Sequence, residues 1–376
     1  MTAKLPSFID RDSDLVDLVD HLRDYPAIAL DAEMDSYYSY YPKLCLIQVS
    51  TDDDDYLIDP LADLDLSPLQ AIFASPDQLK VLHAAENDIP YFKDYVGGEF
   101  VALFDTHIAA KVLGLSRAGL APLLEEYLQV QLDKRFQTAD WRVRPLPVDQ
   151  AEYAMTDTRH LLDLWRLLEP QLEEKELVDL AQFSFAEACQ SSANQRVFNP
   201  DGWRKMVGTN KLHSDQKAML RDLFEWREEL ARHLDLAVFR VLPDGILLAL
   251  THHARSTPRE IRDHFNHRTI REHASEISRV LVEAPARPVG PPVKQPQEGR
   301  LSPAEEKLLT HLRNWRNAHP SAPLTNKHLK KLVDADPANW TDFSSLNIMP
   351  QSMLDTLGKE LWEEYEQNHT RQSGKR

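Results

Sequence analysis

The chain has 376 residues, of which 42% are hydrophobic, 27% are charged and two are cysteines. This length predicts two or three domains, each able to bury its own core, and excludes a small protein held together by disulfides. No stretch approaches eighteen consecutive apolar residues, so we expect no transmembrane helix. The first residues lack the apolar segment of a signal peptide, and Cys45 and Cys189 lack metal-site spacing. We therefore expect a cytoplasmic protein with reduced core thiols.

The formal net charge of −17 argues against a nucleic-acid partner, because Lys and Arg drive phosphate binding. The charge is unevenly distributed, however. Residues 1–211 hold 37 acidic and 19 basic residues, a net charge of −18. Residues 212–376 hold 23 acidic and 24 basic residues, a net charge of +1, and they contain 11 of the 15 histidines. This asymmetry predicts an acidic domain joined to a near-neutral region with a different role.

The first half combines strand-like and helix-like segments. Short β-rich runs that read as an antiparallel meander lie at 27–31, 44–50 and 55–59. The next two runs, 79–83 and 100–105, are each followed by helical periodicity, which indicates parallel strands covered by helices. From 149 to 190 the apolar spacing is helical throughout. The pattern predicts a mixed α/β sheet domain over residues 1–211, in which the acidic run 52–55 is a solvated turn.

The second half reads as helical. We predict one helical module over 212–284, a semi-extended linker over 285–300 in a proline-rich stretch, and a second module over 301–376. A short L-x-x-W-R pattern occurs in both modules, at Leu223, Trp226 and Arg227 and again at Leu312, Trp315 and Arg316. This repeat indicates a duplicated helical module.

Four acids and one tyrosine are candidates for chemistry. Asp31 and Glu33 lie two residues apart at a strand end, so strand geometry projects both carboxylates to the same side of the sheet. Asp88 follows a predicted strand and could also cap the next helix. Tyr153 precedes Asp157 by one helical turn, which places both on one face. Taken singly, these residues also fit solvated acids, a helix cap and a core tyrosine.

The combination of these acids is more informative than any one of them. Carboxylates on a strand, at a βα junction and on a later helix are what a two-metal phosphodiester site requires. Such hard oxygen ligands favour Mg²⁺ or Mn²⁺ over Zn²⁺.

A basic cluster precedes the helix of Tyr153. It consists of Lys134, Arg135, Arg142 and Arg144, the densest group of basic residues in the acidic half. These side chains are candidates for phosphate contacts, with simple charge balance as the alternative.

Several segments resemble a known family. ALDAEM (29–34), VLHAAENDIPYF (81–92) and YAMTDTRHLLDL (153–164) resemble the three exonuclease motifs of the DEDD superfamily, the third in its Y-x-x-x-D form. FQTADWRVRPLP (136–147) resembles the W-x-x-RPL element of ribonuclease D. The helical modules resemble the HRDC modules that follow the exonuclease domain in ribonuclease D.

The resemblance implies a ribonuclease H-like exonuclease domain followed by two HRDC-like modules. It makes Asp31, Glu33, Asp88 and Asp157 the ligands of two divalent cations, with Tyr153 orienting the attacking water. The implied function is a monomeric 3′-5′ exoribonuclease that releases nucleoside 5′-monophosphates from structured RNA such as tRNA precursors, without a membrane or an organic cofactor.

Two other functions stay open at this point. One is a 3′-5′ DNA exonuclease, because the acids do not distinguish the two sugars. The other is a catalytically silent RNA-binding adaptor, although such a protein has no reason to retain four mutually repelling acids.

Overall fold

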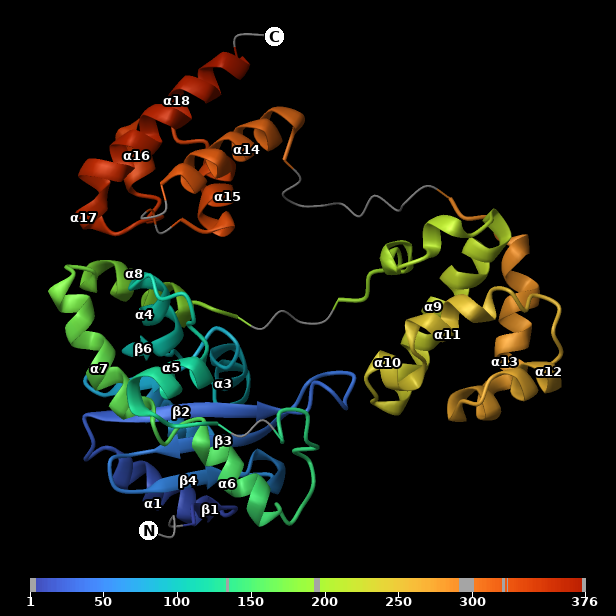
Figure 1. The fold of residues 1–376 in the computed structure, drawn as a ribbon, viewed down its shortest axis with the longest axis horizontal. Coiled ribbons are helices and arrows are strands. Elements are labelled where there is room, and N and C mark those ends of the chain that lie inside the picture. The colour runs from blue at the N-terminus through green and yellow to red at the C-terminus, as the bar shows by residue number, and fades with distance from the viewer. Residues whose placement is uncertain are drawn as a thin grey trace.

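The computed structural model describes residues 5–132, 135–192, 197–290, 301–319, 322 and 324–373. They form a sheet domain followed by two helical modules (Figure 1). Each part has its own buried apolar cluster: the first runs from Ile9 to Cys189, the second from Trp203 to Ala284 and the third from Leu308 to Tyr365. Within these described ranges, no helix has the length and apolar character needed to cross a membrane.

The sheet has six strands in the order β1-β4-β3-β2-β5-β6. Their bounds are β1 Ser7–Ile9, β2 Ala27–Met34, β3 Leu44–Ser50, β4 Asp55–Ile58, β5 Leu79–Leu82 and β6 Leu103–Asp105. The β2-β3-β4 meander is antiparallel, whereas the β1–β4, β2–β5 and β5–β6 pairs are parallel. The predicted mixed sheet is confirmed, and β1 is an edge strand that the sequence pattern did not reveal.

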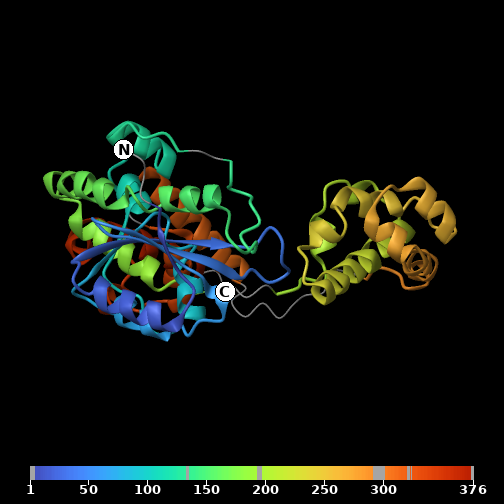
Figure 2. The same ribbon diagram turned by 90° about the horizontal axis from the view of Figure 1, so that it is seen from below.

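Helices cover both faces of this sheet (Figure 2). They are α1 Asp12–Leu22, α2 Gln70–Phe73, α3 Ile89–Tyr95, α4 Thr106–Val112, α5 Leu120–Leu128, α6 Val148–Thr156, α7 Leu161–Glu174 and α8 Val178–Cys189. Every residue of the central strand β3 is buried, as expected for a strand packed on both sides.

The helical run predicted from 149 to 190 is three helices, α6, α7 and α8. A turn separates α6 from α7, and the buried hydroxyls of Thr158 and Ser50 lie 2.8 Å apart there, tying the turn to the end of β3. Glu176 adopts a left-handed conformation with φ of 55° between α7 and α8. Asp157 consequently lies at the end of α6, as its C-cap, and not within a long helix.

The acidic run 52–55 connects β3 to β4, with Asp52 and Asp53 exposed as predicted for a solvated turn, and its side chains also make specific contacts. Asp52 forms an ion pair with Arg166 at 2.8 Å, and Asp55 forms one with Arg159 at 2.6 Å. Asp53 accepts a hydrogen bond from the Tyr25 hydroxyl at 2.9 Å. These contacts join the β3–β4 connection to α7, to the turn before α7 and to the segment after α1, which only the fold brings close.

The first helical module contains α9 Ser214–Leu234, α10 Val238–Val241, α11 Asp244–Leu250, α12 Pro258–His264 and α13 Arg268–Glu283. Trp203 and Met206 pack into its core, so the module begins before the predicted boundary at residue 212. Val289 also packs against this core, which places the start of the predicted linker on the module. Residues 291–300 of that linker lie outside the described part of the chain.

The second module contains α14 Pro303–Ala318, α15 Asn326–Ala335, α16 Trp340–Ser344, α17 Gln351–Met353 and α18 Lys359–Ser373. The arginine of the repeated L-x-x-W-R pattern makes matching contacts in both modules. In each module, the arginine Nη1 donates to a leucine carbonyl. It also donates to the side chain two residues after that leucine, which is the first residue of a helix. The contacts join Arg227 to Leu242 and Asp244, both at 2.7 Å, and Arg316 to Leu324 and Asn326, at 3.5 and 3.0 Å.

The second module packs against α8 of the sheet domain (Figure 1). Nε2 of the buried His328 lies 2.8 Å from a carboxylate oxygen of Glu187, and the His328 ring lies 5.7 Å from the ring of Phe183. Residues far apart in the sequence thus fix this module on the sheet domain.

Candidate active site

Three of the four predicted acids come together at the centre of the sheet. Asp31 and Glu33 project from β2, and Asp157 comes from the end of α6. One carboxylate oxygen from each lies within 4.8 Å of those of the other two. The alternation of side chains along β2 puts Asp31 and Glu33 on one face, and the turn after α6 brings Asp157 to them.

Asp88 lies beside this group, at the start of α3. Its side chain makes no helix-capping hydrogen bond, so the capping role considered from the sequence is not observed. Asp88 is 9% exposed, and the charge of its carboxylate contributes to the raised pKa values of Asp31 and Glu33. The structure therefore places all four acids within electrostatic reach of one another.

Burial is the main cause of raised pKa values in this group, and mutual repulsion adds to it. Burial and the charges of Asp88, Asp157 and Glu33 raise the pKa of Asp31 well above its ordinary value. Burial, with the charges of Asp105 and Asp157, raises the pKa of Asp88 to about 8, and burial raises the pKa of Asp157 to about 6. Hard, converging carboxylates that repel one another fit a divalent cation such as Mg²⁺ or Mn²⁺.

Asp105, which the sequence analysis missed, supports the Asp88 loop. It is fully buried at the end of β6 and accepts four backbone N–H groups. They belong to Ala84, Ala85, His107 and Ile108, at 2.8–3.1 Å. One carboxylate thus caps α4 and also holds the turn before Asp88, where Ala84 has a φ of 58°. The strand-end Asp followed by Thr and His is a capping signal that could have been recognised.

Gln48 is a second residue that the sequence analysis missed. It lies on β3 directly opposite Asp31 in the antiparallel β2–β3 ladder, so the two side chains share one face. Gln48 is fully buried, and neither its amide nitrogen nor its amide oxygen has a hydrogen-bond partner among the described residues. A buried amide without a partner is costly, and this one lies on the same face of the sheet as Asp31.

Tyr153 lies one helical turn before Asp157 and is 8% exposed. Its ring centroid is 5.6 Å from that of Phe136 and 6.1 Å from that of Trp141, so the ring packs among aromatic neighbours. The ring belongs to a small apolar cluster, as the core alternative predicts, and the catalytic role of the hydroxyl stays a prediction.

The predicted basic cluster divides into residues with different surroundings. Lys134 lies outside the described residues. Arg135 is exposed, with its guanidinium 5.6 Å from the ring centroid of Phe136. Arg142 forms an ion pair with Asp140 at 2.8 Å and lies 4.9 Å from the ring centroid of Tyr38.

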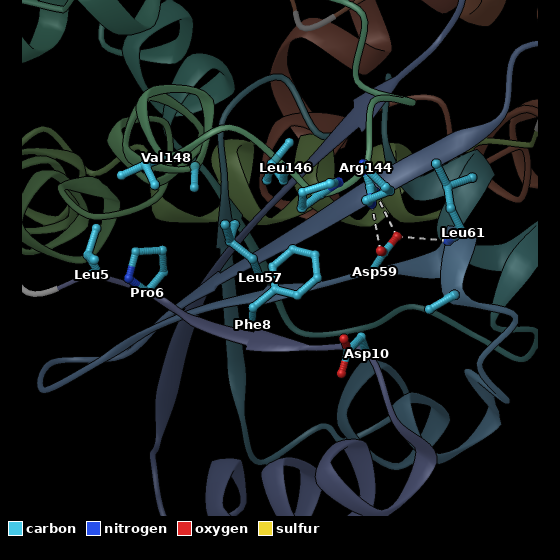
Figure 3. A pocket seen from close by; sticks show the side chains of 13 residues that line it. Leu5, Pro6, Phe8, Asp10, Leu57, Asp59, Leu61, Arg144, Leu146 and Val148 are labelled. Atoms are coloured by element: carbon cyan, nitrogen blue, oxygen red, sulfur yellow. Dashed lines mark hydrogen bonds and ion pairs between the residues drawn. The ribbon is translucent and has the colours of Figure 1, made fainter.

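Arg144 has a structural role in place of the predicted phosphate contact. Two of its N–H donors bind Asp59, both at 2.6 Å, and the others bind the carbonyls of Trp141, Val143 and Cys45. All five donors of the guanidinium are therefore committed to protein acceptors. Figure 3 shows Arg144 and Asp59 at one wall of an apolar cavity of about 560 Å³. None of the four acids of the candidate site lines this cavity.

Comparisons with known proteins agree with this architecture. A family model described as a 3′-5′ exonuclease matches residues 6–173, and an HRDC domain model matches residues 216–281. The chain is 37% identical to ribonuclease D of Escherichia coli over 231 residues, which are 61% of each protein. It is 32% identical over 261 residues to the exosome complex exonuclease RRP6 of Saccharomyces cerevisiae, covering 65% of this chain and 36% of that one.

Two solved structures extend the similarity. Escherichia coli RNase D matches with a TM-score of 0.62 and 27% identity over 98% of this chain and 99% of that one. The catalytic core of RRP6 from Trypanosoma brucei matches with a TM-score of 0.68 and 28% identity over 75% and 80% of the chains. In the sequence comparison, however, the matched region spans less than two thirds of the length of Escherichia coli ribonuclease D and of Saccharomyces cerevisiae RRP6.

The fold and the two domain matches define a protein with a ribonuclease H-like 3′-5′ exonuclease domain followed by an HRDC domain. Within that class, the chain is a homologue of ribonuclease D, and RRP6 is also similar.

Proposed function

We propose that this chain is a metal-dependent 3′-5′ exoribonuclease that releases nucleoside 5′-monophosphates. The observation that carries the proposal is the group of converging, partly buried acids, Asp31, Glu33 and Asp157 with Asp88 beside them. Such a group has no structural advantage without a cation, because its members repel one another in a poorly solvated place. The similarity to ribonuclease D and RRP6 supports the choice of RNA as substrate.

In the proposed mechanism, the four acids hold two Mg²⁺ or Mn²⁺ ions. When bound, such ions lower the pKa of water and stabilise the charge that develops on a phosphodiester during in-line attack. The chain's own residues supply the geometry: the acids fix the site on β2, α3 and the end of α6, and the Tyr153 hydroxyl orients the attacking water. Orientation of this kind lowers the barrier by removing the entropy cost of finding the reactive arrangement.

We propose structured RNA, such as tRNA precursors, as the substrate class. The solved RNase D of Escherichia coli is titled an exoribonuclease involved in structured RNA processing. Exposed Arg135, the neighbouring Arg142 and Lys134 would contact phosphates on the way to the acids. The second helical module would be a further HRDC-like module, as the matching Arg227 and Arg316 contacts support. The protein would act in the cytoplasm as a monomer.

The direct test compares 5′-labelled RNA and DNA of the same sequence with Mg²⁺, Mn²⁺ or EDTA. We expect stepwise shortening of the RNA from its 3′ end, loss of cleavage in EDTA, and loss in Asp31→Asn. Preferential shortening of the DNA would instead establish a DNA exonuclease. RNA binding without cleavage of either strand by the wild-type chain would indicate the adaptor.

A further inference from the structure

The loop between β2 and β3 carries an unusual concentration of tyrosines. Residues 35–43 include Tyr37, Tyr38, Tyr40 and Tyr41, and this loop follows directly after the strand that bears Asp31 and Glu33. Tyr37 is 47% exposed, although a large aromatic ring gains free energy from burial. Figures 1 and 2 both show the loop reaching from the sheet domain to the first helical module.

The loop and this module are joined by specific polar contacts. The buried Tyr40 hydroxyl donates to Glu228 on α9 at 2.7 Å. Lys43 forms an ion pair with Asp235, the residue that ends α9. The loop also contacts the start of α10, because the Ala237 N–H donates to the Tyr38 carbonyl at 2.9 Å, so side chains from the two domains form one surface.

That surface combines aromatic rings with an arginine. The ring centroid of Tyr37 lies 4.9 Å from that of Phe239, which is 41% exposed. The Arg240 guanidinium lies 3.9 Å from the ring centroid of Tyr38 and 4.9 Å from that of Tyr37. Arg240 is exposed, and its Nε donates to the backbone carbonyl of Tyr37 at 2.8 Å. Aromatic rings with a nearby exposed positive charge are the features with which proteins bind single-stranded nucleic acid.

A cavity of about 290 Å³ lies beside these rings, lined in part by Tyr40, Tyr91 and Phe239. Tyr91 belongs to the first turn of α3, and its backbone N–H donates to the carbonyl of Asp88 at 2.9 Å. On the other side, Tyr37 follows Glu33 by four residues, which cannot span more than about 14 Å. The surface is therefore a short distance from the acids, and the cavity offers aromatic side chains to a flat ring system.

We propose that the 35–43 loop and α10 form a stacking site for bases of single-stranded RNA, on the 5′ side of the nucleotide being removed. This inference rests on the proposed function, since it assumes that the 3′ end lies at the acids. Stacking on Tyr37 and Phe239 binds every base, because each has a π-face, and Arg240 pairs with a phosphate. The site would hold the chain after each cleavage without regard to sequence.

The test measures binding without cleavage, in the full chain carrying Asp31→Asn. A 12-nucleotide RNA carries 2-aminopurine at one position at a time, counted from the 3′ end, because stacking on tyrosine quenches this fluorophore. We expect quenching at one or two adjacent positions. In the same background, Tyr37→Ala should abolish the quenching and weaken binding roughly ten-fold, the effect expected from the loss of one stacked base.

Matched variants separate stacking from a role in holding the domains together. Tyr37→Phe keeps the ring and should retain the quenching, and Phe8→Ala removes an exposed ring on β1 and should change neither signal. Unchanged binding in both Tyr37→Ala and Phe239→Ala would refute the proposal. So would loss of binding together with an increased radius of gyration in solution scattering, since the surface would then serve only to attach the helical module. If the wild-type chain cleaves nothing, the proposed function fails, but these binding signals still decide the stacking site.

Discussion

Gln48 lies directly opposite Asp31 across the β2–β3 ladder, on the same face of the sheet, and both of its buried amide atoms lack a hydrogen-bond partner among the residues that the structure describes. A buried amide next to carboxylates can donate a hydrogen bond to one of them once the group is charged and bound to a cation. The relationship predicts that Gln48 keeps an acid correctly oriented, at a cost in stability to the metal-free protein.

Replacement of Gln48 by Met tests this role, because Met has a similar length and no hydrogen-bonding amide. We expect the metal-free protein to be as stable as the wild type or more stable, by up to about 1–3 kcal/mol, since an unsatisfied polar group is removed. Affinity for Mn²⁺ or activity should fall about 10–100-fold. Chemical denaturation and a metal titration measure the two effects. Wild-type activity in Gln48→Met would leave Gln48 without a role in the site.

The support that Asp105 gives to the Asp88 loop leads to a second prediction. In Asp105→Asn one carboxylate oxygen becomes an NH₂ group, which cannot accept from backbone N–H groups. We expect a loss of about 1–3 kcal/mol in the free energy of unfolding and a lower kcat, because the turn that carries Asp88 loosens. Hydrogen exchange at Ala84 and Ala85 should increase more than exchange in β3. An unaltered kcat would show that the Asp88 position does not depend on this cap.

The raised pKa values of the acids predict how stability depends on pH. Carboxylates whose folded-state pKa is raised bind more protons in the folded than in the unfolded protein, so their stabilising contribution is complete below about pH 4. It is lost as the pH rises through about 6 for Asp157 and about 8 for Asp88. We therefore expect the melting temperature of the metal-free protein to fall by several degrees between pH 5 and pH 9, and Mn²⁺ to raise it more at pH 8 than at pH 6, because protons compete with the ion.

Two variants control for the titration of other groups. Asp88→Asn should flatten the metal-free pH profile, and Asp31→Asn should remove most of the Mn²⁺-induced increase. A full Mn²⁺ shift in Asp31→Asn would contradict the role of Asp31 as a ligand.

Tyr153→Phe separates the two parts of this side chain. The variant keeps the ring among Phe136 and Trp141 and removes only the hydroxyl, so the free energy of unfolding should change by only about 1 kcal/mol. If the hydroxyl orients the attacking water, single-turnover cleavage should slow by about 10²–10⁴-fold, with RNA affinity and the Mn²⁺ shift unchanged. A wild-type rate would assign Tyr153 to the apolar cluster alone.

Two arginines of the basic cluster, Arg144 and Arg135, should differ in their effects on stability and on RNA affinity. Arg144→Gln leaves the buried Asp59 carboxylate without its partner, so we expect a loss of about 3–5 kcal/mol in stability with RNA affinity retained by the folded fraction. Arg135→Ala should do the reverse: stability stays close to that of the wild type, and RNA affinity falls together with its dependence on salt. Equal effects of the two variants on affinity would contradict the division that the structure makes between them.

The sequence alone indicated the strands and the residues that are candidates for chemistry. Hydrophobic periodicity marked the meander and the two later strands, because a buried strand needs a short apolar run wherever it lies in the fold. The spacing of Asp31 and Glu33 placed both on one face by the geometry of a single strand, and Tyr153 and Asp157 followed from one turn of helix. The proline-rich stretch and the repeated Leu-x-x-Trp-Arg pattern likewise indicated separate helical modules from local residues.

Only the tertiary structure decided what depends on partners distant in the chain. Arg144 and Arg135 look alike in the sequence, and the fold gives one a carboxylate and three carbonyls and leaves the other exposed. Strand pairing placed Gln48 opposite Asp31, and backbone N–H groups of the turn before Asp88 made Asp105 its support. The tyrosines of the 35–43 loop acquired Phe239 and Arg240 only when a second domain packed beside them. Local sequence patterns determine which side chains a segment carries on each face. Burial and interaction partners depend on contacts between segments far apart in the chain, and such contacts leave no periodicity in the sequence.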